Sequence, residues 1–384
     1  MQRENKAIRV VLIIVLIAVS FLLLFTMNTE ILNFCAKAAL YSAESFMPSV
    51  SLLFKDDEEK VTDAVSLEKD KTKKDDAEDD EKVNAKEKAV IADSNSFTST
   101  PDDIKKLIEQ AKANADKDKK DGAITEKKYI SEGATNKFGA VRVKNLNKTQ
   151  INIEELLSKR ADLSVDRKKP TVLIFHTHTT ESYQYLDRNF YSQGFASRDK
   201  NPKKNMIRVG DAICEQLEEA GFSVLHDTVI HDLRYTGAYD NSRATVVEYL
   251  KKYPSLQVVL DIHRDAIQMS NGTKIKPVAE INGKKAAQVM IISGCQEEGN
   301  GVTDFKDWKQ NLVFALQLQK EMEETFPGLT RPLFFSPRKY NMNLTHCSLL
   351  IEVGSDSNTL EEAEYSGRCI GKSLSQLLEK YIEE

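Results

Sequence analysis

The chain has 384 residues, which is enough for one or two domains of ordinary size. Its apolar content of 41% is normal for a globular protein, but its charged residues are numerous and unevenly spread. The net charge is −5 and the charged segments alternate in sign, so no nucleic-acid partner is expected.

The N-terminus joins a short basic segment to a long apolar one. Residues 1–9 contain Arg3, Lys6 and Arg9, and Val10–Met27 has no charge and no proline. At about 1.5 Å per residue, a helix over 10–27 spans roughly 27 Å, close to the hydrocarbon thickness of a bilayer. This run exceeds a signal-peptide core of about 7–15 residues and lacks a small-x-small cleavage site. We therefore predict an uncleaved signal anchor, with residues 1–9 cytoplasmic and the rest outside a cell membrane.

The next segments differ sharply in composition. Residues 28–54 mix apolar and polar side chains and are interpreted as a juxtamembrane segment. Residues 55–120 are dominated by Lys, Asp and Glu, which cannot bury enough apolar surface to offset the entropy of ordering. We predict a disordered linker over 55–125, with a short helix possible in Asp102–Ala115, and a folded domain over 126–384.

The folded domain alternates strand and helix patterns. Alternation of this kind predicts an α/β domain with a mostly parallel central sheet flanked by helices. The predicted strands are 138–144, 171–175, 222–225, 257–262, 287–292 and 348–353, and the predicted helices are 153–160, 206–220, 241–253, 308–326 and 359–381. The five cysteines are scattered without a CxxC pair, which indicates buried thiols rather than a disulfide framework or a thiolate metal site.

Polar clusters stand where three of these strands end. His176 and His178 follow the strand at 171–175, with Glu181 three residues later; His263 follows the strand at 257–262; and Glu352 lies in the strand at 348–353. In open parallel sheets, sites form beyond the carboxyl ends of the strands. Two imidazoles, one carboxylate and an open position form a common hydrolytic zinc site.

The sequence suggests a role for each of these residues. We predict Zn²⁺ ligands at His178, Glu181 and His263, with Glu352 as the group that moves a proton between water and the leaving amine. His176 is the alternative ligand, or it supports a ligand or the substrate, since alternation along a strand does not separate it from His178.

Two arginines and the remaining histidines are secondary candidates. Arg264 is predicted to assist catalysis at an anionic group, against an ordinary ion pair, and Arg243 is a candidate for binding an anionic substrate group. His226 and His231 are interpreted as surface or rim residues, and His346 precedes the last strand at its wrong end for the site.

Five blocks, in order, resemble stage II sporulation protein P of endospore-forming bacteria: VLIFHTHTTESY, DNSR, VVLDIHRDA, VMIISGC and LLIEVGSDSNTLEEA. More distantly, the last two site blocks are similar to zinc-dependent N-acetylmuramoyl-L-alanine amidases. The glycine-rich GHGG of those amidases is absent, and HTHTTE stands in its place, so the choice between His176 and His178 stays open.

The resemblance implies a membrane-anchored peptidoglycan hydrolase of engulfment, located between mother cell and forespore. Its implied activity is amidase cleavage between the muramic lactyl group and L-alanine, with endopeptidase action on crosslinks also associated with the family. The implied partners are a sporulation lytic transglycosylase, stage II protein D, and stage II protein M. The alternatives are a non-catalytic wall-binding scaffold, a zinc carboxypeptidase-like peptidase, or a metal-independent phosphatase with a histidine nucleophile.

Overall fold

The computed structural model describes residues 94–192 and 194–383. The predicted segments 1–9, 10–27 and 28–54 lie outside these residues. The predicted single-pass membrane location must be corrected, because no described helix combines the length and the apolar character needed to cross a bilayer. The longest described helix, α9 (Leu360–Glu379), has 20 residues but carries Glu361, Glu364 and Arg368.

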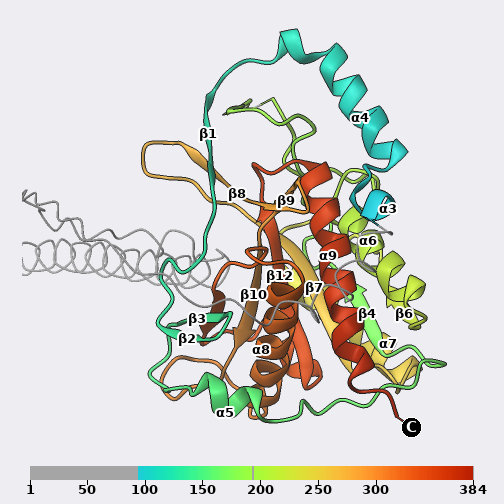
Figure 1. The fold of residues 1–384 in the computed structure, drawn as a ribbon, viewed down its shortest axis with the longest axis vertical. Helices are drawn as coiled ribbons and strands as arrows, with labels where there is room; N and C mark the ends of the chain where they lie inside the picture. The colour runs from blue at the N-terminus through green and yellow to red at the C-terminus, as the bar shows by residue number, and fades with distance from the viewer. Residues whose placement is uncertain (1–93, 193, 384) are drawn as a thin grey trace, which may run out of the picture. The chain divides into compact units, whose positions relative to one another are not determined.

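An eight-stranded sheet forms the centre of the fold, as the alternating sequence pattern predicts (Figure 1). Its strand order is β2-β3-β11-β10-β12-β7-β4-β6. Among the described strands of this sheet, β2–β3 and β10–β12 pair antiparallel and the other neighbours pair parallel. The bounds are β2 (Asn136–Phe138), β3 (Val141–Asn145), β4 (Val172–Phe175), β6 (Val224–His226), β7 (Val258–Asp265), β10 (Val289–Gly294), β11 (Leu333–Ser336) and β12 (Cys347–Ser355).

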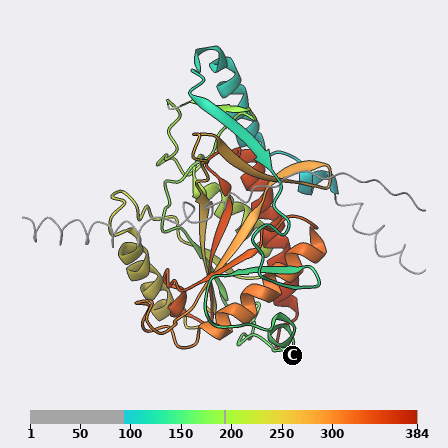
Figure 2. The ribbon, with the colours of Figure 1, turned by 90° about the vertical axis from the view of Figure 1, so that its left-hand side faces the viewer.

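Helices cover both faces of this sheet. On one face α6 (Met206–Glu219) packs against α9, and α9 packs against α8 (Trp308–Thr325). On the other face α7 (Ala238–Lys252) buries Val246 against Leu173, Phe175 and Val259. Figure 2 shows α7 on one side of the sheet and α8 and α9 on the other. Within residues 122–383, the other helical elements are α5 (Ile153–Leu157) and the 3-10 turn η2 (Met342–Leu344).

Local sequence signals explain where the helices begin and end. Thr359 caps α9 and forms a reciprocal capping box with Glu362. Asn205 caps α6 by accepting a hydrogen bond from the backbone N–H of Ile207. After α6 the chain turns at Gly221, whose φ of 81° is a conformation that glycine adopts without steric cost. These positions agree with the helices predicted from the sequence.

A second, four-stranded sheet was not predicted. Its order is β5-β1-β8-β9, with β1 (Gly122–Lys127) between β5 (Phe190–Tyr191) and β8 (Lys274–Ile281). β9 (Lys284–Ala287) completes a hairpin with β8. Charged residues alternate along these strands without a strong apolar period, so the sequence pattern resembled polar loops.

The described residues that precede β1, 94–121, pack onto the domain, although they fall within the predicted linker over 55–125. They form α3 (Ser94–Thr98), α4 (Asp102–Ala113) and the 3-10 turn η1 (Ala115–Lys117). Phe97 stacks on Phe326 with ring centroids 5.8 Å apart, and Asp103 lies 3.2 Å from Arg208 of α6. Ile104 is buried. The high average charge of the segment concealed these few apolar anchors.

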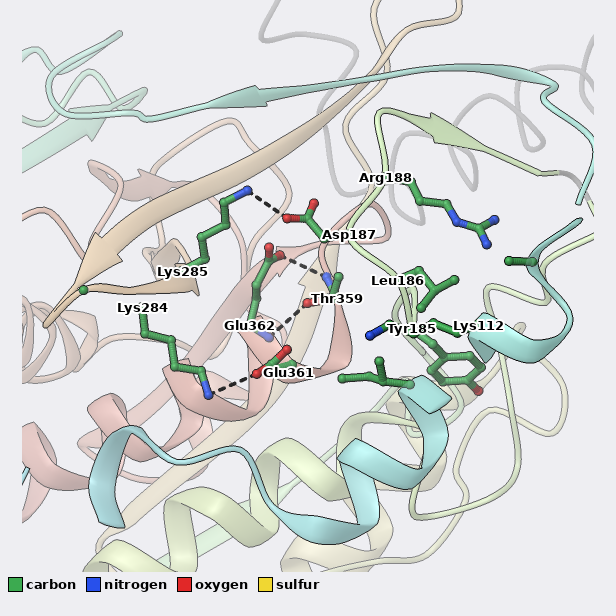
Figure 3. A pocket seen from close by; sticks show the side chains of 13 residues that line it. Lys112, Tyr185, Leu186, Asp187, Arg188, Lys284, Lys285, Thr359, Glu361 and Glu362 are labelled. Atoms are coloured by element: carbon green, nitrogen blue, oxygen red, sulfur yellow. Dashed lines mark hydrogen bonds and ion pairs between the residues drawn. The ribbon is translucent and has the colours of Figure 1, made fainter. Parts of the chain in front are cut away.

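A cavity of about 620 Å³ lies where this N-terminal arm meets the loop at 185–188 and the β8–β9 hairpin (Figure 3). Lys284 lies 3.2 Å from Glu361, and Lys285 lies 2.8 Å from Asp187, so opposite charges are paired along the wall of the cavity. None of the predicted site residues lines it. The cavity therefore does not serve the predicted zinc chemistry.

Candidate functional site

Three parallel strands bring the predicted polar clusters to one edge of the large sheet. β4, β7 and β12 run in the same direction, so their carboxyl ends meet at that edge. The turn after β4 carries His178 and Glu181, β7 carries His263, and β12 carries Glu352. Glu352 and His263 are direct register partners. All four side chains are buried.

His178 is buried under aromatic rings and keeps one ring nitrogen unpaired. Its ring stacks on Tyr235 with centroids 4.7 Å apart, and meets the ring of His263 edge-on at 5.3 Å. Among the described residues, none forms a hydrogen bond with His178 Nδ1. Burial lowers the pKa of His178 to about 4, so the imidazole is neutral. A neutral, unpaired imidazole nitrogen is suited to bind a metal ion.

His263 lies between two carboxylates. Its Nδ1 is 3.9 Å from Glu181 Oε2, and its Nε2 is 2.8 Å from Asp261 Oδ1. The second contact is an ion pair rather than a hydrogen bond, because Nε2 makes no well-aligned hydrogen bond within the described chain. Burial alone would lower the pKa of His263, but Asp261 and Glu181 outweigh burial and raise it to about 9.

The two glutamates beside His263 differ in their affinity for protons. Burial, reinforced by Asp265, raises the pKa of Glu352 to about 8, and Glu352 Oε2 has no hydrogen-bond partner among the described residues. Burial also acts on Glu181, but Arg264 and His263 outweigh it and lower the pKa of that carboxyl. Two carboxyls whose environments separate their pKa values are suited to different roles, here a metal ligand and a proton carrier.

His176 points away from this site. Its Nδ1 lies 3.0 Å from the carbonyl oxygen of Ile262, and its Nε2 lies 2.9 Å from His226 Nε2. A Cβ on Gly210 of α6 would come within 2.7 Å of His176 Nε2, so this imidazole packs under α6. β4 ends at Phe175, and the turn that follows breaks the alternation that would have put His176 and His178 on one side. This geometry favours His178 as the ligand.

The two arginines predicted to assist the reaction have structural partners. The Arg264 guanidinium donates hydrogen bonds to the backbone carbonyls of Ser182, Asp265 and Ser197. Arg243 donates to the side-chain oxygens of Asn341 and Asn343. The catalytic role predicted for Arg264 and the substrate-binding role predicted for Arg243 stay predictions, and both guanidinium groups have partners within the protein. Arg264 braces the loop that carries Glu181, and Arg243 braces the turn around η2.

The remaining histidines divide between the interior and the surface. His231 is 3% exposed and pairs with Asp227 at 2.8 Å, so its predicted surface position is wrong. His226 is partly buried and pairs with Asp211 as well as His176. His346 is exposed and pairs with Asp162, in agreement with its predicted place outside the site.

The donor set at the sheet edge fits a zinc ion in its chemistry. It offers two imidazoles and a carboxylate, with His178 Nδ1 unpaired and buried. The ligand atoms are not drawn tightly together: within the described residues, the group of acidic or metal-binding side chains that lie within 4.8 Å of one another is Glu126, Asp187 and Glu362. Those three carboxylates already surround the ammonium of Lys276, at 3.0, 2.6 and 2.7 Å. That group is therefore an ion-pair cluster rather than a metal site.

Sequence reasoning missed several side chains around the ligands. Tyr239 meets His178 edge-on at 5.7 Å and stacks on His263 at 6.3 Å, and Tyr235 covers His178. No local pattern marks these tyrosines. The sequence could have indicated that Asp261 lies beside His263, because it precedes His263 by two residues in one strand and so lies on the same face.

Solved structures with a distant likeness to the chain are amidases, among them N-acetylmuramoyl-L-alanine amidases. The CwlD amidase from Clostridioides difficile in complex with the GerS lipoprotein has a TM-score of 0.35 and 13% identity, covering 55% of this chain and 99% of that one. The amidase AmiC2 of Nostoc punctiforme has a TM-score of 0.32 and 10% identity, covering 55% and 96%. Likeness at this level does not support comparison of individual residues.

Sequence comparisons are more specific. The chain is 32% identical to stage II sporulation protein P of Bacillus subtilis (strain 168) over 221 residues, which are 54% of this chain and 51% of that protein. The match thus spans about half the length of this curated relative. The family model of stage II sporulation protein P matches residues 27–375, most of the chain. This protein therefore belongs to the stage II sporulation protein P family.

Proposed function

We propose that the chain is a zinc-dependent peptidoglycan hydrolase that cleaves the amide between the muramic lactyl group and L-alanine. The observation that carries this proposal is the pairing of Glu352 with His263 on neighbouring strands, next to His178 and Glu181. A buried carboxyl with an unpaired oxygen lies directly beside a donor set that suits zinc.

In this proposal His178, Glu181 and His263 hold the zinc ion. When bound, the ion supplies Lewis acidity that polarises the amide carbonyl and activates water. Glu352 Oε2 accepts the proton of the attacking water and then delivers it to the nitrogen of the leaving amine. Each step leaves the proton on a named atom, and the products are a free lactyl carboxylate and a peptide with a free L-alanine amine.

The buried surroundings of Glu352 favour this proton transfer. The residue is 3% exposed, so bulk water does not compete for the carboxyl. Arg264 acts indirectly, through Glu181. Its backbone N–H donates a hydrogen bond to Glu181 Oε2 at 3.2 Å, and its guanidinium binds the backbone carbonyls of Ser182 and Ser197. Arg264 thus orients Glu181 in this scheme.

Membership of the family supports a biological role in spore formation. We extend the proposal to engulfment of the forespore, with a lytic transglycosylase, stage II protein D, and stage II protein M as partners. Co-purification of these proteins from sporulating cells with the full chain tests this part separately from the chemistry.

The test is digestion of purified peptidoglycan by the full chain and by its Glu352→Gln variant, with zinc content measured for both. We expect wild type to release peptides that begin with L-alanine, and Glu352→Gln to lower kcat by about 10²–10⁴-fold while zinc remains bound. Glu323→Gln is the matched control, because Glu323 accepts hydrogen bonds from Gly328 and Thr330 and from none of the proposed site residues.

The products separate this activity from its alternatives. Release of single D-alanine residues would indicate a carboxypeptidase, and cleaved crosslinks would show that the site also acts as an endopeptidase. A wild-type chain that binds peptidoglycan without cleaving it would overturn the hydrolase assignment in favour of a scaffold.

A further inference from the structure

The side chain behind His263 is Asp261, which the hydrolase scheme above does not use. Asp261 is 1% exposed, and its three close contacts all come from the site region. Oδ1 lies 2.8 Å from His263 Nε2 and accepts the backbone N–H of Thr177 at 2.8 Å, while Oδ2 accepts the Thr177 hydroxyl at 2.6 Å. A charge this deeply buried is costly unless it is held by partners of this kind.

The hydroxyls behind Asp261 form a chain of hydrogen bonds that ends at its carboxylate. An ionised carboxylate only accepts, so the Thr177 hydroxyl proton points to Asp261. In the contact of 2.7 Å between Thr177 Oγ1 and Ser242 Oγ the donor is then Ser242, whose hydroxyl has a second, longer acceptor in the Tyr239 carbonyl at 3.2 Å. Asn341 Nδ2 in turn donates to Ser242 Oγ at 3.3 Å. Donors thus run from Asn341 through Ser242 and Thr177 to Asp261, and each hydrogen bond polarises the next.

The start of this chain of hydrogen bonds is a bend held in an unfavourable conformation. Tyr340 and Asn341 have φ of 40° and 61°, the left-handed region that residues other than glycine rarely adopt. Asn341 is held there by its bond to the carbonyl of Tyr239 at 3.0 Å and by Arg243 at 3.3 Å. Strained backbone of this kind persists where the surrounding contacts fix it, commonly near functional sites.

We propose that Asp261 is the positioning residue for His263: its carboxylate lies 2.8 Å from Nε2, which fixes the orientation of the ring and so directs Nδ1 toward Glu181 and the zinc ion. This inference rests on the proposed function, because it assigns a partner to one of the proposed ligands. Nδ1 is the nitrogen that faces Glu181 Oε2, at 3.9 Å. A ligand histidine whose other nitrogen meets a carboxylate has a fixed tautomer and ring orientation.

The test measures the affinity of the full chain for zinc alone, by competition with a chelator, in wild type and in Asp261→Asn. We expect the zinc Kd to rise by about 10–100-fold in Asp261→Asn, in line with the loss of such supporting carboxylates elsewhere. Thr177→Val is expected to raise the zinc Kd by a smaller factor than Asp261→Asn. Thr177→Ser, which keeps the hydroxyl, is expected to retain the wild-type Kd.

Asp227→Asn is the matched control. Asp227 and His231 form another buried pair at 2.8 Å in the same unit, with exposed fractions of 1% and 3%. We expect its substitution to lower the melting temperature as Asp261→Asn does, without changing the zinc Kd. A second readout is the ¹⁵N spectrum of the histidine side chains without zinc, recorded at a pH above the raised pKa of His263 so that the imidazole is neutral, in which Asp261→Asn should lower the share of the proton on Nε2.

The outcomes separate the two proposals. A Kd in Asp261→Asn equal to that of wild type, with an unchanged His263 spectrum, overturns the positioning role and leaves the hydrolase standing. A wild-type chain that binds zinc but cleaves no peptidoglycan overturns the hydrolase and leaves the positioning role standing. A wild-type chain without affinity for zinc overturns both.

Discussion

Two groups of carboxylates in the folded part of the chain each surround a buried basic side chain, Lys276 in one group and His263 in the other, and their pKa values shift differently. At the second sheet, Glu126, Asp187 and Glu362 lie 2.6–3.0 Å from the ammonium of Lys276, which is 1% exposed. Lys285 adds a second ammonium, 2.6 Å from Glu126 and 2.8 Å from Asp187. Every one of these carboxylates therefore lies within 3.0 Å of at least one ammonium.

At the edge of the large sheet, Glu181 pairs with Arg198 and His263, and Asp261 pairs with His263, but Glu352 forms no ion pair among the described residues. Glu181, Asp261 and Glu352 lie around His263, and Glu352 Oε2 and His178 Nδ1 have no hydrogen bond among the described residues. The pKa of Glu352 rises while those of Glu126 and Asp187 fall. The difference teaches that closeness of acidic groups does not mark a functional site. Unpaired buried atoms and separated pKa values mark it better.

The largest expected effect is a loss of bound zinc, and it tells which of His176 and His178 belongs to the site around His263. We expect His178→Ala to lose stoichiometric zinc, since His178 supplies an unpaired ring nitrogen to the proposed site. His176→Ala should keep zinc and lose stability by about 1–3 kcal/mol, because it leaves His226 and the Ile262 carbonyl without their buried partner. Metal analysis and thermal unfolding of both variants provide the measurement. Zinc lost from His176→Ala but kept by His178→Ala would reverse the assignment.

The sequence could predict the large sheet and the convergence of its strand ends. Buried strands such as Val172–Phe175 and Val258–Asp265 show continuous apolar runs, and the rule that sites form at carboxyl ends then brings Glu181, His263 and Glu352 together. The rule works because it depends on strand direction alone, which the alternation of helices and strands already implies.

The sequence could not separate His176 from His178, nor reveal the second sheet. The first choice depends on β4 ending at Phe175, a boundary of one residue that no periodicity fixes. The second sheet depends on β1 inserting beside β8, a pairing between residues far apart in the chain that is held by charged side chains. The sequence could not reveal the partners of Arg264 and Arg243 for a related reason, because an arginine that binds carbonyls or amides has the same sequence signature as a free one.

The carboxylates around Lys276 should contribute more to stability than the carboxylates around His263. We expect Lys276→Ala to lower the free energy of unfolding by about 3–5 kcal/mol, because it leaves the buried Glu362 without its cation. Lys285→Ala is the control: its ammonium contacts the same Glu126 and Asp187 but is about half exposed, and its loss should cost less than about 1 kcal/mol. Chemical denaturation of both variants measures the difference. Equal losses would contradict the distinction between buried and exposed partners.

The smallest expected effect is a dependence of the free energy of unfolding on pH, caused by the carboxylates around Lys276. Burial alone would raise the pKa values of Glu126 and Asp187, but hydrogen bonds from Lys285 and Lys276 outweigh it and lower both below their ordinary values of 4.5 and 3.8. The unfolded chain then binds protons at higher pH than the folded chain, so this stabilisation is complete above the unfolded values and is lost as pH falls through the lowered folded ones. Asp187→Asn removes one of these carboxylates. The difference in unfolding free energy between wild type and Asp187→Asn should therefore be largest above about pH 5 and shrink toward pH 3. A difference that stays constant over this range would mean that Asp187 stabilises the loop at 185–188 through its shape and neutral hydrogen bonds. The stability would then not depend on an ion pair between the Asp187 carboxylate and the ammonium of Lys276.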